Sequence, residues 1–254
     1  MPTLRVIGAG RAGLALSEAL RRAGWDVVPP LHHTDPVADA AAGIDLLVLA
    51  VPDHAIAATA AAVDPDPSGR AVVAHLAGAL GLDVLAPHRR VGSLHPMVAL
   101  PDEVEGAKRL RGAWFAVAGD PLLAVAASDL GGQTVEVADR DRPLHHAAAV
   151  IASNHLVALL AGVERIAARA GVPLEAELDL VRATVENVAA LGPVRAAAGP
   201  VARGDWATVG AHLAALGEDD RPAYVTMAAE AARLAGRVLP AGLVCGSRPS
   251  YPRR

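Results

Sequence analysis

A glycine-rich turn near the N-terminus constrains the fold more than any other feature of this sequence. Gly8-Ala-Gly-Arg-Ala-Gly13 follows a short apolar stretch, Thr3–Ile7, and precedes apolar residues at helical spacing in Leu14–Ala23. A strand, a GxGxxG turn and a helix in this order bring unpaired N–H groups and a partial positive charge to a diphosphate. The context predicts a dinucleotide site. The alternative is a glycine-rich connection that holds no ligand.

The three glycines have separate tasks in such a turn. Gly8 permits the tight turn, Gly10 lets the backbone approach a diphosphate, and Gly13 lets the helix pack closely on the strand. We therefore expect the whole turn to contact the cofactor: Gly8, Ala9, Gly10, Arg11, Ala12 and Gly13.

Strand patterns alternate with helical patterns through the first half of the chain. The predicted strands after Thr3–Ile7 are Asp26–Val28, Ile44–Val51, Ala71–Leu76, Arg90–Ser93, Trp114–Ala118 and Thr134–Val137. Helices are predicted between them at Ala38–Ala42, Ile56–Val63 and Leu80–Leu85. From Leu144 onward only helical periods occur, in Leu144–Ala170, Leu174–Leu191, Asp205–Leu216 and Arg221–Val238. The pattern predicts an α/β protein with an N-terminal doubly wound parallel-sheet Rossmann domain (residues 1–140) and an all-α C-terminal domain (residues 141–254).

Composition excludes several other classes. The 254 residues are 53% hydrophobic and carry a net charge of −4, which is typical of a globular protein and argues against a nucleic-acid partner. The single cysteine, Cys245, excludes a disulfide framework, and with no tight His/Asp/Glu cluster we expect no metal site. A reducing compartment, the cytoplasm, fits this cysteine usage.

The longest apolar run, Ala147–Val163, carries Ser153, Asn154 and His155 near its middle. We therefore expect a buried interdomain or intersubunit helix, not a membrane span. Its small residues would allow close helix approach, which favours a homodimer formed through the helical domain.

The second predicted strand leads to Leu31-His-His-Thr34, with no carboxylate before Asp35. An acid at this point usually holds the ribose hydroxyls of NAD, and it would repel the 2′-phosphate of NADP. His33, with its neighbour His32, can donate hydrogen bonds to that phosphate. The segment favours NADP, with NAD possible and an ordinary polar loop as the alternative.

Polar residues follow three further strands, where ligands bind in open parallel sheets. Val51-Pro52-Asp53 closes the third strand, and we expect it to line the cofactor, with helix capping by Asp53 as the alternative. His75 ends the next strand and is a further cofactor-binding candidate. His95 is the candidate proton donor. For both histidines the alternative is a packed neutral imidazole bonded to the backbone.

The helical half contributes three candidate catalytic residues. His146 and Asn154 interrupt an apolar helix, where an amide needs a partner in a ligand or across a helix interface. Arg203, in the polar loop Gly199–Asp205, has the planar fork that binds a carboxylate, with bonds to carbonyls as the alternative.

Several segments together resemble a known bacterial group, the two-domain Rossmann-like proteins with a DUF2520 C-terminal domain. The matching stretches are Gly8–Gly13, Ala50–Asp53, Leu85–Pro87, Gly92–Met97, His146–Ala149, Ala152–Asn154, Gly199-Pro200 and Ala202–Asp205. The group is related to 6-phosphogluconate dehydrogenase-like proteins, F420-dependent NADP oxidoreductases and prephenate dehydrogenases. His95-Pro96-Met97 also resembles the catalytic-histidine segment of the prephenate dehydrogenases. Leu76-Ala77-Gly78 departs from the group's usual Thr-Ser-Gly or Ser-Ser-Gly and lacks its hydroxyl.

The expectation is an NADP-dependent oxidoreductase that moves a hydride between the cofactor and a small, carboxylated substrate. His95, His146, Asn154 and Arg203 would form its catalytic set. The alternatives are a non-catalytic NADP-binding sensor, which the missing hydroxyl at Ala77 favours, and an F420-dependent NADP reductase.

Overall fold

The structure is a computed structural model that describes residues 1–244. Cys245 lies outside the described residues. The chain forms two compact units, Met1–Asn154 and a second beginning at His155. They are called the sheet unit and the helical unit below.

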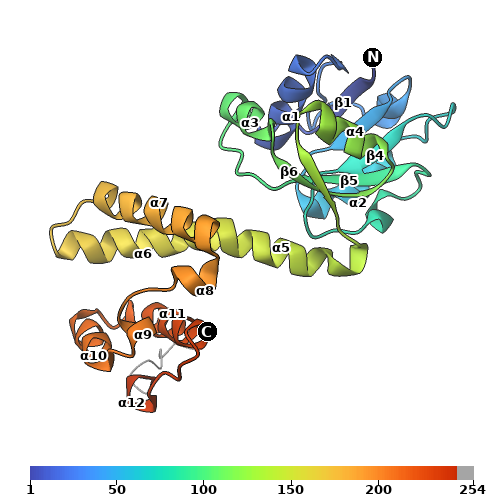
Figure 1. Cartoon of the computed structure of the whole chain (residues 1–254). Coiled ribbons are helices and arrows are strands. Elements are labelled where there is room, and N and C mark those ends of the chain that lie inside the picture. The colour runs from blue at the N-terminus through green and yellow to red at the C-terminus, as the bar shows by residue number, and fades with distance from the viewer. Residues whose placement is uncertain (245–254) are drawn as a thin grey trace. The chain divides into compact units, whose positions relative to one another are not determined.

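The sheet unit (Figure 1) contains a single sheet. It has seven strands in the order β2-β1-β3-β4-β5-β6-β7. The strands are β1 (Thr3–Ile7), β2 (Asp26–Val27), β3 (Leu46–Leu49), β4 (Val72–His75), β5 (Val91–Pro96), β6 (Trp114–Gly119) and β7 (Gln133–Glu136). Its α-helices are α1 (Arg11–Arg22), α2 (Ile56–Ala62), α3 (Glu103–Leu110), α4 (Leu122–Asp129) and α5 (Arg142–Val150). Short 3₁₀ turns occur at Ala38–Ala41, Asp53–Ala55, Leu82–Leu85 and Asp139–Asp141.

Alternate side chains of the strands point to two faces, and each face has its own apolar core. On one face, Val6, Val48 and Ala74 pack with buried residues of α1, α3 and α4. On the other, Leu47 and Val73 pack with buried residues of α2 and of the 3₁₀ turns. Because helices cover both faces, the predicted doubly wound α/β fold is confirmed.

The sheet departs from the all-parallel prediction at one pair of strands. Five neighbouring pairs are parallel, but β6 runs antiparallel to β5, with His95 opposite Ala116 and Pro96 opposite Phe115. The end of β5 therefore lies beside the start of β6, so the connection through α3 leaves and re-enters the sheet at one edge. The sequence analysis also missed α3 and α4, and the helices predicted at Ala38–Ala42 and Leu80–Leu85 are 3₁₀ turns.

The predicted long helix Leu144–Ala170 forms, but it is not uniform. α5 leads into a π-helical turn, Ile151–His155, and then into α6 (Leu156–Arg169). The two compact units divide inside this π turn, between Asn154 and His155. The sequence places its boundary at residues 140 and 141, where the last strand pattern ends, and that boundary stays a prediction.

The helical unit consists of α6, α7 (Leu174–Leu191), α8 (Pro193–Ala196), α9 (Pro200–Arg203), α10 (Trp206–Ala215), α11 (Arg221–Leu234) and α12 (Ala241–Val244). α6 and α7 lie side by side (Figure 1). A small core forms around Val201, Val209, Ala228 and Ala232. Arg165 of α6 donates to the buried carboxylate of Asp220, which precedes α11.

Candidate functional site

The glycine turn has the geometry that its sequence predicts. Gly8 has a φ of +108°, which favours glycine, and a Cβ there would lie 2.5 Å from the Ala50 carbonyl oxygen. A Cβ on Gly13 would overlap the Gly8 carbonyl oxygen and lie 2.9 Å from the Val6 side chain. With glycine at positions 8 and 13, β1, β3 and α1 lie closer together than any other residue at these positions would allow.

Gly10 differs from these two glycines because its missing side chain leaves open space. A Cβ built on Gly10 has no neighbour within 4 Å among the described residues, and both Gly10 and Arg11 are exposed. Gly10 is the N-cap of α1 and has no side chain to cap it, so the first N–H groups of the helix point outward without an intrahelical acceptor. A dinucleotide's diphosphate fits this arrangement of donors and free space.

The segment after β2, which is predicted to bind the ribose end of the cofactor, lies beside this turn. The Gly8 N–H donates to the Leu31 carbonyl at 2.9 Å, so the following residues His32, His33 and Thr34, all exposed, start next to the glycines. Asp35, the first carboxylate after the strand, accepts from the His32 N–H at 2.7 Å. Its charge is thus partly engaged by its own loop.

The end of β3 lies directly beneath the glycine turn. The Ala50 N–H donates to the Ile7 carbonyl at 2.8 Å, and Val51, Pro52 and Asp53 continue from there. Asp53 is exposed, and its side chain caps neither the 3₁₀ turn nor α2, so capping does not explain it. These residues stand at the carboxyl ends of β1 and β3, where the strand order reverses and ligands of open α/β sheets bind.

A second polar group occupies the same sheet further along, on the face of Leu47 and Val73. His75 is paired with Ser93 across β4 and β5, and His95 lies two residues beyond Ser93. Because strand side chains alternate, all three project from one face. Ser93 and His75 are both fully buried, which is unusual for polar side chains.

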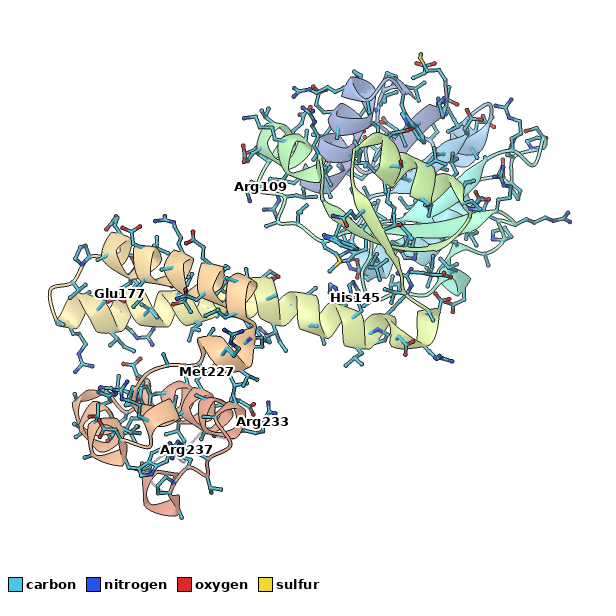
Figure 2. The ribbon with its side chains drawn as sticks, viewed as in Figure 1. Arg109, His145, Glu177, Met227, Arg233 and Arg237 are labelled. Atoms are coloured by element: carbon cyan, nitrogen blue, oxygen red, sulfur yellow. The ribbon has the colours of Figure 1, made fainter. Side chains whose placement is uncertain are left out.

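α5 supplies the other side of this polar group. Arg142 is buried and its Nη1 donates to Ser93 Oγ at 2.9 Å, while its Nε donates to Asp139 at 3.2 Å. His145, one turn further along α5 (Figure 2), and His146 both meet His95 edge-on, with ring centres 5.8 and 5.7 Å away. The predicted catalytic residues His95 and His146 are therefore brought together.

Gly78 lets His95 and His146 converge. A Cβ on Gly78 would overlap Nδ1 of His146 and lie 2.9 Å from Nε2 of His95. Any larger residue at position 78 would displace one of the two rings. The absence of a side chain at Gly78, in the loop after β4, is therefore what lets the two imidazoles approach each other.

The Leu76 carbonyl fixes the tautomer of His95. Its oxygen lies 3.0 Å from His95 Nδ1, and since a carbonyl only accepts, neutral His95 carries its proton on Nδ1 and leaves Nε2 as an acceptor. Burial lowers the pKa of His95, and the nearby His146, His145 and Arg142 lower it further, while the Leu76 carbonyl acts the other way. Near neutral pH, His95 Nε2 can accept a proton.

His75 has a different environment. Its imidazole is completely buried and its Nε2 lies 3.2 Å from the Gly81 carbonyl. Burial lowers the pKa of His75, which keeps the ring neutral. Its part in cofactor binding stays a prediction, and with the ring inaccessible such a contact would come from its main chain.

The remaining predicted catalytic residues are Asn154, at the end of the sheet unit, and Arg203, in the helical unit. Asn154 is exposed in the π turn, and its Oδ1 accepts from Ser153 Oγ at 2.9 Å. Arg203 is exposed at the end of α9 in the helical unit. Their catalytic roles stay predictions.

The sequence analysis missed Arg142, Ser93 and Gly78. Arg142 has a detectable signal, because residues three and four positions apart share a helix face, and His145 and His146 stand at those spacings from it. Ser93 and Gly78 carry no such signal, since their roles depend on contacts with a helix distant in sequence.

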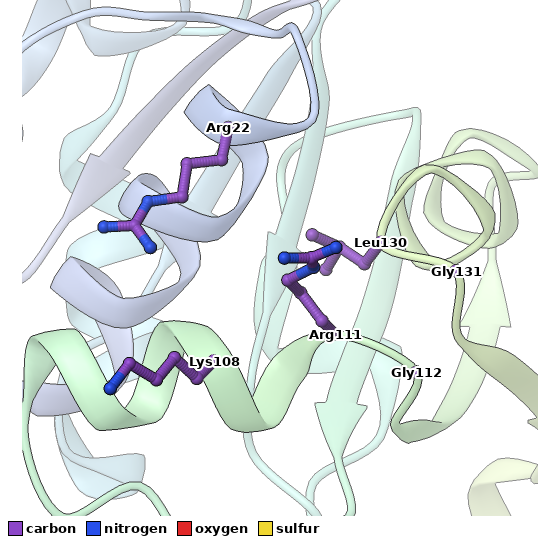
Figure 3. Close-up of a pocket in the computed structure, with 6 residues that line it drawn as sticks. All are labelled: Arg22, Lys108, Arg111, Gly112, Leu130 and Gly131. Atoms are coloured by element: carbon purple, nitrogen blue, oxygen red, sulfur yellow. The ribbon is translucent and has the colours of Figure 1, made fainter.

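A surface hollow elsewhere in the sheet unit is lined by Arg22, Lys108, Arg111, Gly112, Leu130 and Gly131 (Figure 3). Arg22 ends α1, whose other end begins at the glycine turn, so the hollow is separate from the dinucleotide site. Arg22 and Lys108 already pair with Glu18 and Glu105. The hollow therefore adds no residue to the candidate site.

Comparison with protein families agrees with this architecture. Residues 29–101 match the Rossmann-like domain, and residues 116–231 match the domain of unknown function DUF2520. The chain carries a Rossmann-like domain followed by a DUF2520 domain. The resemblance drawn from the sequence is thereby confirmed. The DUF2520 match begins inside β6, so it includes β7 and α5 of the sheet unit as well as most of the helical unit.

Solved structures share the fold of this Rossmann-like/DUF2520 chain. A candidate NADP oxidoreductase from Bacteroides fragilis has a TM-score of 0.77 and 22% identity, covering 91% of this chain and 98% of its own. A protein from Thermotoga maritima has a TM-score of 0.69 and 21% identity over 92% and 98%. Pyrroline carboxylate reductase from Plasmodium falciparum, solved with NADP bound, has a TM-score of 0.61 and 13% identity over 92% and 98%. No curated protein matches the sequence.

Proposed function

We propose that this protein is an NADP-dependent oxidoreductase acting on a small, carboxylated substrate. The observation that carries the proposal is the turn Gly8–Gly13, in which two glycines pack the backbone tightly and the third, Gly10, opens onto free space at the start of α1. Of the proteins that share this fold, the Plasmodium falciparum reductase was solved with NADP. When bound, the cofactor would supply the hydride chemistry.

The chain's own contribution to the reaction would be proton transfer and positioning. His95, with Nδ1 held by the Leu76 carbonyl, has its Nε2 beside Gly78 and His146. It would take a proton from the substrate hydroxyl or amine during oxidation, and return it during reduction. His146 would orient the reacting group from the opposite side.

Two residues beyond the cluster complete the proposed set. Asn154 has an amide nitrogen that can donate to the substrate, and it lies in a π turn, a distortion that often occurs at functional sites. Arg203 presents an exposed guanidinium at the end of α9, which suits a substrate carboxylate.

The preference for NADP over NAD rests on the segment beside the glycine turn. Exposed His32, His33 and Thr34 offer donors to a 2′-phosphate, and the first carboxylate, Asp35, is engaged by the His32 N–H. An unengaged acid would favour NAD instead.

One observation favours a second candidate, a protein that binds NADP without catalysis. Ala77 is buried where the resembling group has a serine, so no hydroxyl is available at that point of the loop. Tight NADP binding with no turnover on a panel of keto acids and imines would support this candidate.

A thermal-shift titration with NADP and NAD tests the cofactor site. Ligand at about 100 times its dissociation constant stabilises by about 2.7 kcal/mol, and we expect NADP to reach this at the lower concentration. Gly10→Asp should abolish the shift, because it places bulk and negative charge against the diphosphate. Ala124→Asp, which adds the same charge to the exposed first turn of α4, is the control and should keep the shift. An unchanged shift in Gly10→Asp would refute the assigned turn.

We also propose that the helical unit pairs with a second copy of the chain. α7 buries none of its residues, and Leu180, Val185 and Val188 are 63%, 56% and 40% exposed. Exposed apolar faces of this kind usually mark an interface. A copy of the same chain is the natural occupant because a twofold axis lets one apolar face cover its equal.

Length and composition alone would let the helix Asp139–Arg169 cross a membrane. Its first turn, however, holds Arg142 buried against β5, and its middle carries Ser153, Asn154 and His155. We therefore interpret its exposed apolar side chains as part of the proposed dimer surface.

A further inference from the structure

Arg142 has the largest fully buried side chain of the described residues, and it is a cation. Burying a guanidinium is costly, and an apolar side chain of similar volume would hold a helix on a sheet at least as well. Mere attachment of α5 therefore does not account for an arginine at this position. Its neighbours show what else the residue does.

One direct contact and two features of its surroundings link Arg142 to the candidate proton-transfer group. Its Nη1 donates to Ser93 Oγ, and Ser93 lies between His75 on the next strand and His95 on its own. Its Nε is held by Asp139, so the fork is oriented from two sides. His145 and His146 follow on the same helix face and meet His95 edge-on.

We propose that Arg142 is a positioning residue, which docks the first turn of α5 on Ser93 and thereby sets His145 and His146 against His95. Gly78 provides the space that this docking requires, since a Cβ there would overlap His146. The role of His95 in proton transfer rests on the proposed function, but the arrangement that Arg142 imposes does not.

The fixed charge of Arg142 gives the arrangement an electrostatic consequence. Guanidinium keeps its proton under all working conditions, whereas imidazoles titrate. The groups acting on His95 are the Leu76 carbonyl from the loop after β4 and His146, His145 and Arg142 from α5. None of these is a carboxylate. Burial and the three α5 side chains lower the pKa of His95, while the Leu76 carbonyl opposes them, and the net direction favours neutral His95, the form that accepts a proton.

The test is an NMR titration of the imidazole C–H signals in the protein without cofactor, with His95 assigned by the signal missing from His95→Gln. In Arg142→Gln we expect the midpoint of His95 to rise by about half a pH unit or more, because a nearby buried positive charge is lost. In Arg142→Lys, which keeps the charge without the fork, the midpoint should rise less while the ring shifts of His145 and His146 change.

Arg140→Gln is the matched control, because Arg140 lies two residues earlier and its side chain is 86% exposed. This variant also removes one positive charge, and the titration midpoint of His95 in it should equal that of the unmodified protein within experimental error. Ser93→Ala, a milder change, keeps the charge and removes the anchor, and should alter the His145 and His146 signals even if Arg142→Gln does not fold.

An unchanged His95 midpoint in folded Arg142→Gln, or unchanged imidazole signals in Ser93→Ala, would overturn the proposal and leave Arg142 as a structural contact. Because the titration needs neither NADP nor substrate, this outcome is distinct from a failure of the oxidoreductase assignment.

Discussion

Strand β3 buries all four of its side chains, whereas the 18-residue helix α7 buries none. The sheet unit encloses two apolar cores, one on each face, while the core of the helical unit centres on four buried residues, Val201, Val209, Ala228 and Ala232. A doubly wound sheet covers itself with its own helices, but a helix pair leaves its outer faces uncovered. The difference leads us to expect that a second surface covers the helical unit and that the sheet unit needs none.

We expect the largest difference between the units in how replacing a helical glycine by alanine changes the free energy of unfolding. In α1, Gly13→Ala should destabilise the sheet unit by about 3 kcal/mol, since the new Cβ overlaps the Gly8 carbonyl oxygen and this backbone cannot give way. In α6, Gly162→Ala should stabilise by roughly 0.5–1 kcal/mol, because the nearest atom to its Cβ, the end of Arg165, is 3.8 Å away. Chemical denaturation of both variants measures the two changes. A stable Gly13→Ala would contradict the close packing at the turn.

Leu180→Glu tests whether the exposed face of α7 is covered by a second copy. If this face is exposed to solvent, the change should alter the free energy of unfolding by less than about 0.5 kcal/mol, since leucine and glutamate have similar helix propensities. In a dimer interface it should cost about 2 kcal/mol or more and yield monomers, as measured by size-exclusion chromatography with light scattering. Val104→Glu is the control, because Val104 is 56% exposed on α3 of the sheet unit. An unchanged mass for Leu180→Glu would remove α7 from the interface.

Acid should weaken the sheet unit before the helical unit. Burial lowers the pKa of His75, His95 and His145, so the folded sheet unit binds fewer protons than the unfolded chain does near the ordinary histidine pKa of about 6.5. Its stability is complete above this value and falls as the pH drops below it. In the helical unit, hydrogen bonds from Thr208 lower the pKa of Asp205, whose contribution is lost only near and below the ordinary value of 3.8.

Unfolding at pH 7 and pH 5, followed by the tryptophans of each unit (Trp25 and Trp114 against Trp206), measures this difference. His75→Leu should flatten the pH dependence of the sheet unit, because it removes one of the buried imidazoles. Equal acid sensitivity of the two units would show that the buried imidazoles do not control it.

The sequence predicted the elements whose signals are local. β1, β3, β4 and the glycine turn form where they were predicted, because a buried strand is a continuous apolar run and the turn needs glycines at fixed spacing. α3 and α4 were missed because each has only eight residues, too few to display a helical period. The antiparallel setting of β6 was missed because a strand pattern carries no direction.

For the candidate site too, local features could be predicted from the sequence and long-range contacts could not. The sequence alone determined the turn Gly8–Gly13 and the polar strand ends, and it singled out His95 and His146 as candidates, since each of these signals depends on neighbours along the chain. Only the tertiary structure decided that Arg142 is buried on Ser93, that Gly78 makes room for two imidazoles, and that the Leu76 carbonyl fixes the tautomer of His95. The first two contacts join α5 to β5 and to the loop after β4, segments about 50 residues or more apart in the sequence, and the third joins residues 19 positions apart. No local periodicity encodes which of many polar side chains will meet across such separations.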